Sequence, residues 1–192
     1  MRLAHLIILG TALPGAVQAA EITSVVTQYR DACKLTEKLQ ESGDEYYACP
    51  GYRDIGVTVL VGHDSNHVSF GPKAQDECAF RQSFAAYSTP QPSIEWRVKG
   101  DRAFAAIQMW SANRTDAGNR SDDWLVVTRL ELGKTCRIAA IQASLPEAAA
   151  KARRKADERA SGFDCDGDNL EITAEAAMDI RELMNEYRCE KP

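Results

Sequence analysis

The sequence lacks the short motifs that mark the common catalytic and redox sites. None of its six cysteines is spaced as C-x-x-C, which excludes the usual thiol-oxidoreductase and zinc-ribbon signatures. Neither Gly-x-Ser-x-Gly nor Ser-x-x-Lys occurs, so the serine nucleophiles that these motifs mark are not expected. No segment after residue 20 is apolar over the roughly 18 residues that a bilayer span needs. We therefore expect no membrane span in the mature chain.

The chain also has an excess of acidic over basic residues. It carries 23 Lys and Arg against 28 Asp and Glu. Without residues 1–20, which contain one arginine and no acid, 22 basic residues remain and the net charge is −6. One basic run spans residues 151–159, but Asp157 and Glu158 interrupt it. Since binding to phosphates needs clustered cations, no nucleic-acid partner is expected.

The N-terminus has the pattern of a secretory signal peptide. Arg2 precedes an apolar run over residues 3–13, Pro14-Gly15 follows, and small residues at 16–20 provide a cleavage site. We expect residues 1–20 to be removed on export, which would leave a soluble periplasmic or secreted protein. Residues 21–192 fit a single globular domain with a C-terminal helical extension over about 166–192.

All the cysteines follow the signal peptide, and their even number indicates disulfides in an oxidising compartment. They are Cys33, Cys49, Cys78, Cys136, Cys165 and Cys189. We pair Cys33 with Cys49, because they bracket a predicted helix end and a turn. We pair Cys136 with Cys165, because the predicted helix between them could bring Cys165 back to the edge of the sheet. Cys78 then pairs with Cys189. The rival pairing of Cys165 with Cys189 needs the segment after Cys165 to run back along the tail helix.

The stretch from residue 94 to residue 144 indicates the fold class. Ile94, Trp96 and Val98 alternate with polar residues, and Gly100-Asp101 provides a two-residue turn. This turn predicts the pairs Lys99–Arg102, Val98–Ala103, Trp96–Ala105 and Ile94–Ile107. Runs at 124–130 and 135–141 add two more strands. The predicted fold is α+β, an antiparallel β-meander of four to six strands packed by helices and linked by disulfides.

The rest of the chain is expected to supply the cover for this sheet. Helices are predicted over residues 21–40, 72–88, 146–162 and 173–188, and short strands over 55–61 and 67–70. Because both faces of the meander carry apolar residues, we expect helices on each face.

Two groups of residues have the chemistry of metal ligands. Asp164, Asp166, Asp168 and Glu175 stand at positions 1, 3, 5 and 12 of a loop with EF-hand spacing. Position 6 is Asn169 where glycine is usual, and an acidic surface linker is the alternative interpretation. His63 and His67 flank Asp64 and could bind zinc or copper, although they surround a predicted turn. No cofactor is the favoured expectation, and calcium at the acidic loop is possible.

Several segments in order resemble a known family. They are Ile94-Glu95-Trp96-Arg97, Trp124 to Leu130, Thr135 to Ala139, and Phe163-Asp164-Cys165. With Cys33, Cys49-Pro50-Gly51 and Val68 to Gly71, they are similar to an uncharacterised family of exported proteins common in alphaproteobacteria. The resemblance covers roughly residues 30–165 and implies a periplasmic address, with no assigned activity. His63, His67, Cys78 and the tail after Cys165 depart from the family pattern.

These observations favour a non-enzymatic periplasmic protein that binds another protein or a component of the cell envelope. A hydrolase that uses carboxylates is the first alternative, since a catalytic pair of acids cannot be recognised without geometry. A metal- or calcium-binding protein is the second alternative.

Overall fold

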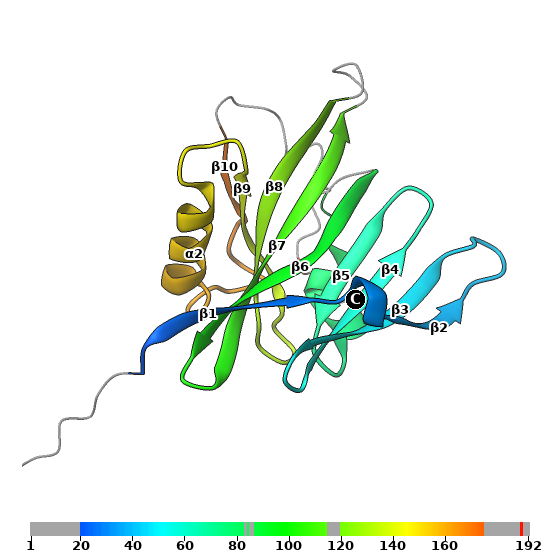
Figure 1. Ribbon diagram of the computed structural model, residues 1–192, viewed down its shortest axis with the longest axis horizontal. Coiled ribbons are helices and arrows are strands. Elements are labelled where there is room, and N and C mark those ends of the chain that lie inside the picture. Colours follow the sequence, from blue (N-terminus) through cyan, green and yellow to red (C-terminus); the bar gives the residue numbers. More distant parts are fainter. Residues whose placement is uncertain (1–19, 83, 85–86, 115–119, 175–188, 190–192) are drawn as a thin grey trace, which may run out of the picture.

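The computed structural model describes residues 20–82, 84, 87–114, 120–174 and 189, which form two β-sheets and two α-helices (Figure 1). The larger sheet has the order β1-β6-β7-β8-β9-β10, and the smaller has the order β2-β3-β4-β5. The larger sheet comprises β1 (Ile22–Gln28), β6 (Ser88–Lys99), β7 (Arg102–Arg114), β8 (Arg120–Arg129), β9 (Cys136–Gln142) and β10 (Glu171–Thr173). The smaller comprises β2 (Lys34–Lys38), β3 (Glu45–Tyr52), β4 (Ile55–Val61) and β5 (Asn66–Phe70). The helical elements are η1 (Arg30–Ala32), η2 (Ala74–Asp76), α1 (Cys78–Arg81) and α2 (Ala148–Arg159).

This architecture is mostly β with few helices, and it is α+β-like and linked by disulfides. The smaller sheet is antiparallel throughout, whereas the larger is mixed, because β10 pairs parallel to β9. The predicted signal peptide lies almost entirely outside the described residues. Residues 175–188 of the predicted tail helix also lie outside them. Within the described part of the chain, no helix is long and apolar enough to span a membrane.

Strands β6, β7 and β8 each pair antiparallel with the next strand in the sequence. Lys99 faces Arg102 and Val98 faces Ala103, which confirms the predicted turn at Gly100. Beyond Val98 the register shifts, so that Trp96 faces Ala106 and Ile94 faces Gln108. The predicted partners Ala105 and Ile107 are therefore wrong by one position. The extra residue lies in β7, and alternation within β6 carries no signal for it.

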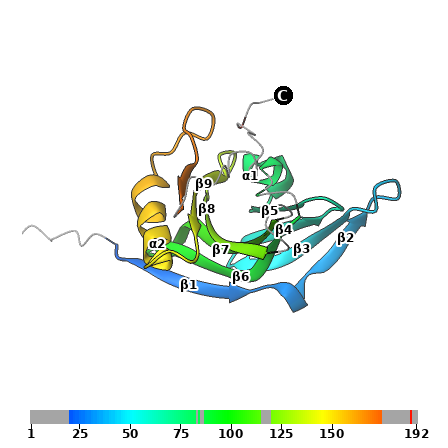
Figure 2. The same cartoon turned by 90° about the horizontal axis from the view of Figure 1, so that it is seen from above.

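The two faces of the larger sheet are covered differently, as Figures 1 and 2 show. On one face, α2 packs its buried alanines Ala152 and Ala156 against residues such as Ile138. On the other face, Trp96, Trp110 and Trp124 lie fully buried in a core shared with the smaller sheet. The expectation of helices on both faces is thus wrong for this second face, because a second sheet buries the apolar surface there.

Two of the predicted helices are absent from the described residues. Residues 21–40 form β1, η1 and β2, which agrees with five β-branched residues among the seven of β1. Among the described residues of 72–88, which leave out 83, 85 and 86, the helical elements are the short η2 and α1, and Ser88 already begins β6. The predicted helix at 146–162 is confirmed by α2, and the predicted strands at 55–61 and 67–70 correspond to β4 and β5.

The two sheets approach each other closely at Gly51. A Cβ atom at this position would lie 2.2 Å from the carbonyl oxygen of Ile55 and 3.1 Å from two ring atoms of Trp96. The Trp96 ring also contacts Phe70 of β5 and Tyr52 of β3, with centroid distances of 5.5 and 6.2 Å. The absence of a side chain at Gly51 therefore allows Trp96 to occupy the space between the sheets.

We predict that Gly51→Ala will lower the free energy of unfolding by about 2–4 kcal/mol, because the methyl group must displace backbone or the buried indole. Urea denaturation monitored by tryptophan fluorescence measures the change. Gly56→Ala is the matched control, since the nearest atom to its Cβ is 3.7 Å away. This control should shift stability by less than about 1 kcal/mol. Equal effects of the two substitutions would contradict the interpretation.

Candidate functional site

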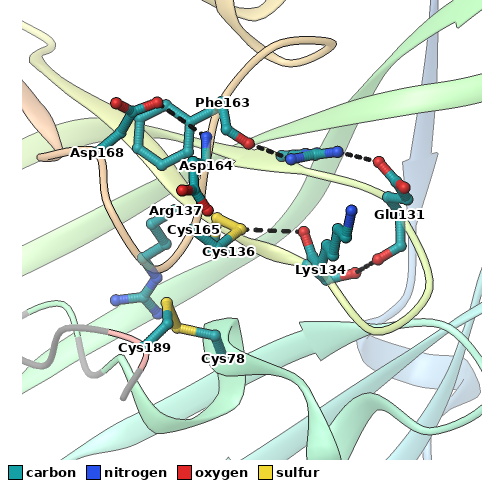
Figure 3. The surroundings of a disulfide bond; sticks show 12 residues. Cys78, Glu131, Lys134, Cys136, Arg137, Phe163, Asp164, Cys165, Asp168 and Cys189 are labelled. Carbon is teal, nitrogen blue, oxygen red and sulfur yellow. Dashed lines mark hydrogen bonds and ion pairs between the residues drawn. A yellow bond between two sulfur atoms is a disulfide. The ribbon is translucent and has the colours of Figure 1, made fainter. Parts of the chain in front are cut away.

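Three disulfides fix the positions of all six cysteines. They join Cys33 to Cys49, Cys78 to Cys189 and Cys136 to Cys165, with Cα separations of 4.1, 5.3 and 5.9 Å. This is the predicted connectivity, and it excludes the rival pairing of Cys165 with Cys189. Figure 3 shows the two bonds near the start of β9. These cysteines are oxidised, so they are structural links and not candidate nucleophiles.

In the acidic loop after α2, carboxylates accept hydrogen bonds from backbone N–H groups of the same loop. Oδ1 of Asp164 accepts a hydrogen bond from the N–H of Asp166 at 3.2 Å. Oδ2 of Asp168 accepts one from the N–H of Asp164 at 2.8 Å, which Figure 3 shows. Glu175, the predicted ligand at position 12, lies outside the described residues. Over the chain that the structure describes, no group of three or more His, Cys, Asp or Glu side chains could hold a metal ion. Calcium binding at this loop stays a prediction.

The two histidines of the predicted zinc or copper site have different environments. The His63 side chain is largely exposed and lies 3.9 Å from Asp64. His67 is partly buried, and its ring nitrogens lie 2.9 Å from Oγ of Ser65 and 2.7 Å from the carbonyl oxygen of Phe80. Burial lowers the pKa of His67, so the ring is neutral at neutral pH. Because both of its nitrogens have partners, His67 is positioned as a structural side chain between β5 and α1.

The open edge of β1 is the feature that the sequence did not reveal. β1 pairs with β6 on one side, and the sheet order places no described strand on its other side. The N–H of Tyr29, just after β1, donates to the carbonyl oxygen of Pro92 at 3.1 Å. Since backbone groups alternate between the two sides of an antiparallel strand, those of Val25 and Thr27 also point toward β6. The backbone groups of Ile22, Ser24, Val26 and Gln28 therefore point outward.

Side chains on both faces of the sheet hold this edge in place. Nε1 of Trp96 donates to Oγ1 of Thr27 at 2.8 Å, on the face toward the smaller sheet. On the face toward α2, Arg97 donates to Ser24 and makes a two-fold ion pair with Asp157 of α2, at 2.8 and 2.6 Å. Bidentate arginine–carboxylate pairs have a well-defined geometry. The outward groups of β1 are thus pre-positioned by the body of the domain.

Strand β1 has none of the usual features that protect a sheet edge. It contains no charged residue and no proline, and Val26 is 61% exposed. Strand β2, at the edge of the smaller sheet, differs: it carries Lys34, Glu37 and Lys38, and its register shifts between Leu35 and Glu37. β1 is therefore the better template for an additional strand.

No family model matches the chain, and neither a curated protein nor a solved structure matches it. The resemblance to exported alphaproteobacterial proteins consequently stays an expectation. What the structure defines is a class, a disulfide-linked arrangement of two packed sheets in which the described edge strand β1 carries no charge and no proline.

The disulfides close chain segments of very different length, which gives a prediction about their contributions. The sequence separation is 16 residues for Cys33–Cys49 and 111 for Cys78–Cys189. In the chain-entropy model, replacing the first pair by alanine should cost about 3 kcal/mol, and replacing the second about 4–5 kcal/mol. Urea unfolding of the two double variants under oxidising conditions measures both values. A larger loss from the shorter loop would contradict this order.

A second prediction concerns Tyr29, at the end of β1. Its side chain is buried, and its Oη accepts a hydrogen bond from Nε2 of Gln108 at 2.8 Å. Burial raises the pKa of Tyr29 from 10 to about 12, because the phenolate is poorly solvated there. The resulting stabilisation is complete below pH 10 and is lost as the pH rises toward 12.

The free energy of unfolding of the wild type should therefore fall more steeply between pH 9 and pH 11.5 than that of Tyr29→Phe, which has no phenolic group. Urea denaturation at the two pH values measures both slopes. Near-ultraviolet circular dichroism at pH 7 is the control that the variant keeps its fold. Equal pH dependence of the two proteins would show that Tyr29 is not responsible.

Proposed function

We propose that the protein is an exported, non-enzymatic binding module that accepts an extended segment of a cell-envelope protein along β1. The observation that carries this proposal is the uncharged, proline-free edge of β1, with its outward backbone groups and exposed Val26. An added strand would form main-chain hydrogen bonds with Ser24 and Val26, and side-chain contacts would give it specificity. The rigid anchoring of β1 reduces the entropy that binding would cost.

The chemistry of the edge defines the partner. Because β1 has no charge, a segment with alternating β-branched and small polar residues matches it better than an acidic or basic one. Three disulfides are compatible with a periplasmic or extracellular location and support export as part of the proposal. The geometry of the described side chains gives no specific support to a hydrolase or to a calcium carrier.

The test uses a labelled peptide with the sequence of residues 22–28 and blocked ends, which is the simplest uncharged strand of matching register. We expect it to bind the wild-type protein saturably in fluorescence anisotropy. Val26→Pro should weaken binding at least about tenfold, because proline removes an outward N–H that the new strand needs. The N–H of Val26 does not point to β6, so β1 should stay paired.

Val26→Thr is the matched control, since threonine loses the apolar side chain but keeps the N–H and the strand preference. It should bind within a few-fold of the wild type. Urea denaturation of both variants checks that the fold survives. Equal affinity of Val26→Pro and Val26→Thr, or no saturable binding to the wild type, would overturn the proposal.

A further inference from the structure

Arg137 differs from the other buried arginines that the structure describes. Arg97 is paired with Asp157, and Arg129 bonds to Glu131 and to the carbonyl oxygen of Phe163. Arg137 is 2% exposed, and its Nη1 and Nη2 atoms have no hydrogen-bond partner among the described residues. A buried guanidinium carries a large desolvation cost that only an anion or several acceptors can offset.

The guanidinium is held in place by its surroundings. Its carbon lies 4.7 Å from the ring centroid of Trp110, which stacks the cation on an aromatic face. The backbone N–H of Arg137 donates to Oε1 of Gln82 at 2.8 Å, and Nε2 of Gln82 lies 3.8 Å from Sγ of Cys189. Figure 3 shows the side chain extending from β9 toward the Cys78–Cys189 bond. The cation is thus fixed between two disulfides.

Aromatic rings pack around Trp110, on which the guanidinium stacks. Phe84 packs against both Trp110 and Trp124, with centroid distances of 5.9 and 6.0 Å, and all three rings are fully buried. The charge of Arg137 also acts on His67: burial lowers the pKa of His67, and the charge of Arg137 lowers it further. His67 is therefore uncharged at neutral pH and adds no second positive charge beside Arg137. Burial also lowers the pKa of Arg137 to about 9, which keeps it protonated at neutral pH.

We propose that Arg137 is the recognition group of a binding site for a small aromatic carboxylate. The two free terminal nitrogens match the two oxygens of a carboxylate in an end-on, bidentate pair. The apolar part of the ligand would lie against the Trp110, Phe84 and Trp124 rings. This site is independent of the β1 edge, since it is formed by β7, β8, β9 and the segment around α1.

The probe is benzoate, with benzyl alcohol as the uncharged control of the same size. Tryptophan fluorescence follows binding, because Trp110 stacks on Arg137 and packs through Phe84 against Trp124, and thermal unfolding gives a second readout. Benzoate should change the fluorescence saturably and raise the Tm of the oxidised wild-type protein, whereas benzyl alcohol should do neither.

Arg137→Met keeps much of the side-chain volume but removes the charge, and Arg137→Lys keeps the charge but loses the planar fork. We expect benzoate affinity to fall at least about tenfold in both, and further in Arg137→Met. Without ligand, Arg137→Met should unfold at a temperature equal to or above that of the wild type, since an uncompensated buried cation is removed.

Two outcomes would overturn this inference. One is the absence of a saturable effect of benzoate on the wild type, a measurement that does not depend on how any variant folds. The other is a marked fall in the Tm of ligand-free Arg137→Met without a change in benzoate response, which would show that Arg137 is already paired within the chain.

Discussion

The packing of Trp96 between the two sheets is the interaction on which the rest of the structure depends. The indole contacts Phe70 of β5 and Tyr52 of β3, approaches Gly51, and donates to Thr27 of β1. One side chain of β6 therefore links both sheets and the edge strand. Aromatic side chains bury large apolar surfaces, so a change in the relative position of the sheets would expose apolar surface of this ring.

The strands that could be predicted are those whose signal is local. Alternation in β6 and the Gly100 turn predict the first two pairs of the hairpin, and the run in β8 is rich in β-branched residues. The register shift beyond Val98 was missed, because it depends on an extra residue in the partner strand. The nature of the cover on the Trp96 face was missed as well, since apolar residues on a strand do not specify whether a helix or a sheet packs there.

The candidate sites illustrate the same limit. The cysteine pairing followed from predicted helices and turns, and it is correct even though residues 21–40 form strands instead of the predicted helix. The spacing of Asp164, Asp166 and Asp168 gave no information on how their carboxylates bond. Residues such as Val25 and Val26 fit a helical spacing and a strand alternation equally well, and pairing with β6 decides between them. Arg137 has no sequence signal at all, because an arginine in a strand is usually solvated. Its isolation is a property of the assembled core.

The connectivity of the disulfides has a consequence for how the chain reaches its oxidised state. Cys33 and Cys49 are neighbours in the sequence, but the Cys136–Cys165 bond is nested inside the Cys78–Cys189 bond. A chain oxidised in the order in which its cysteines cross a membrane would join Cys33 to Cys49 correctly and then Cys78 to Cys136 incorrectly. For a chain oxidised in this order, reaching the native pairing would require thiol–disulfide exchange after the first bonds form.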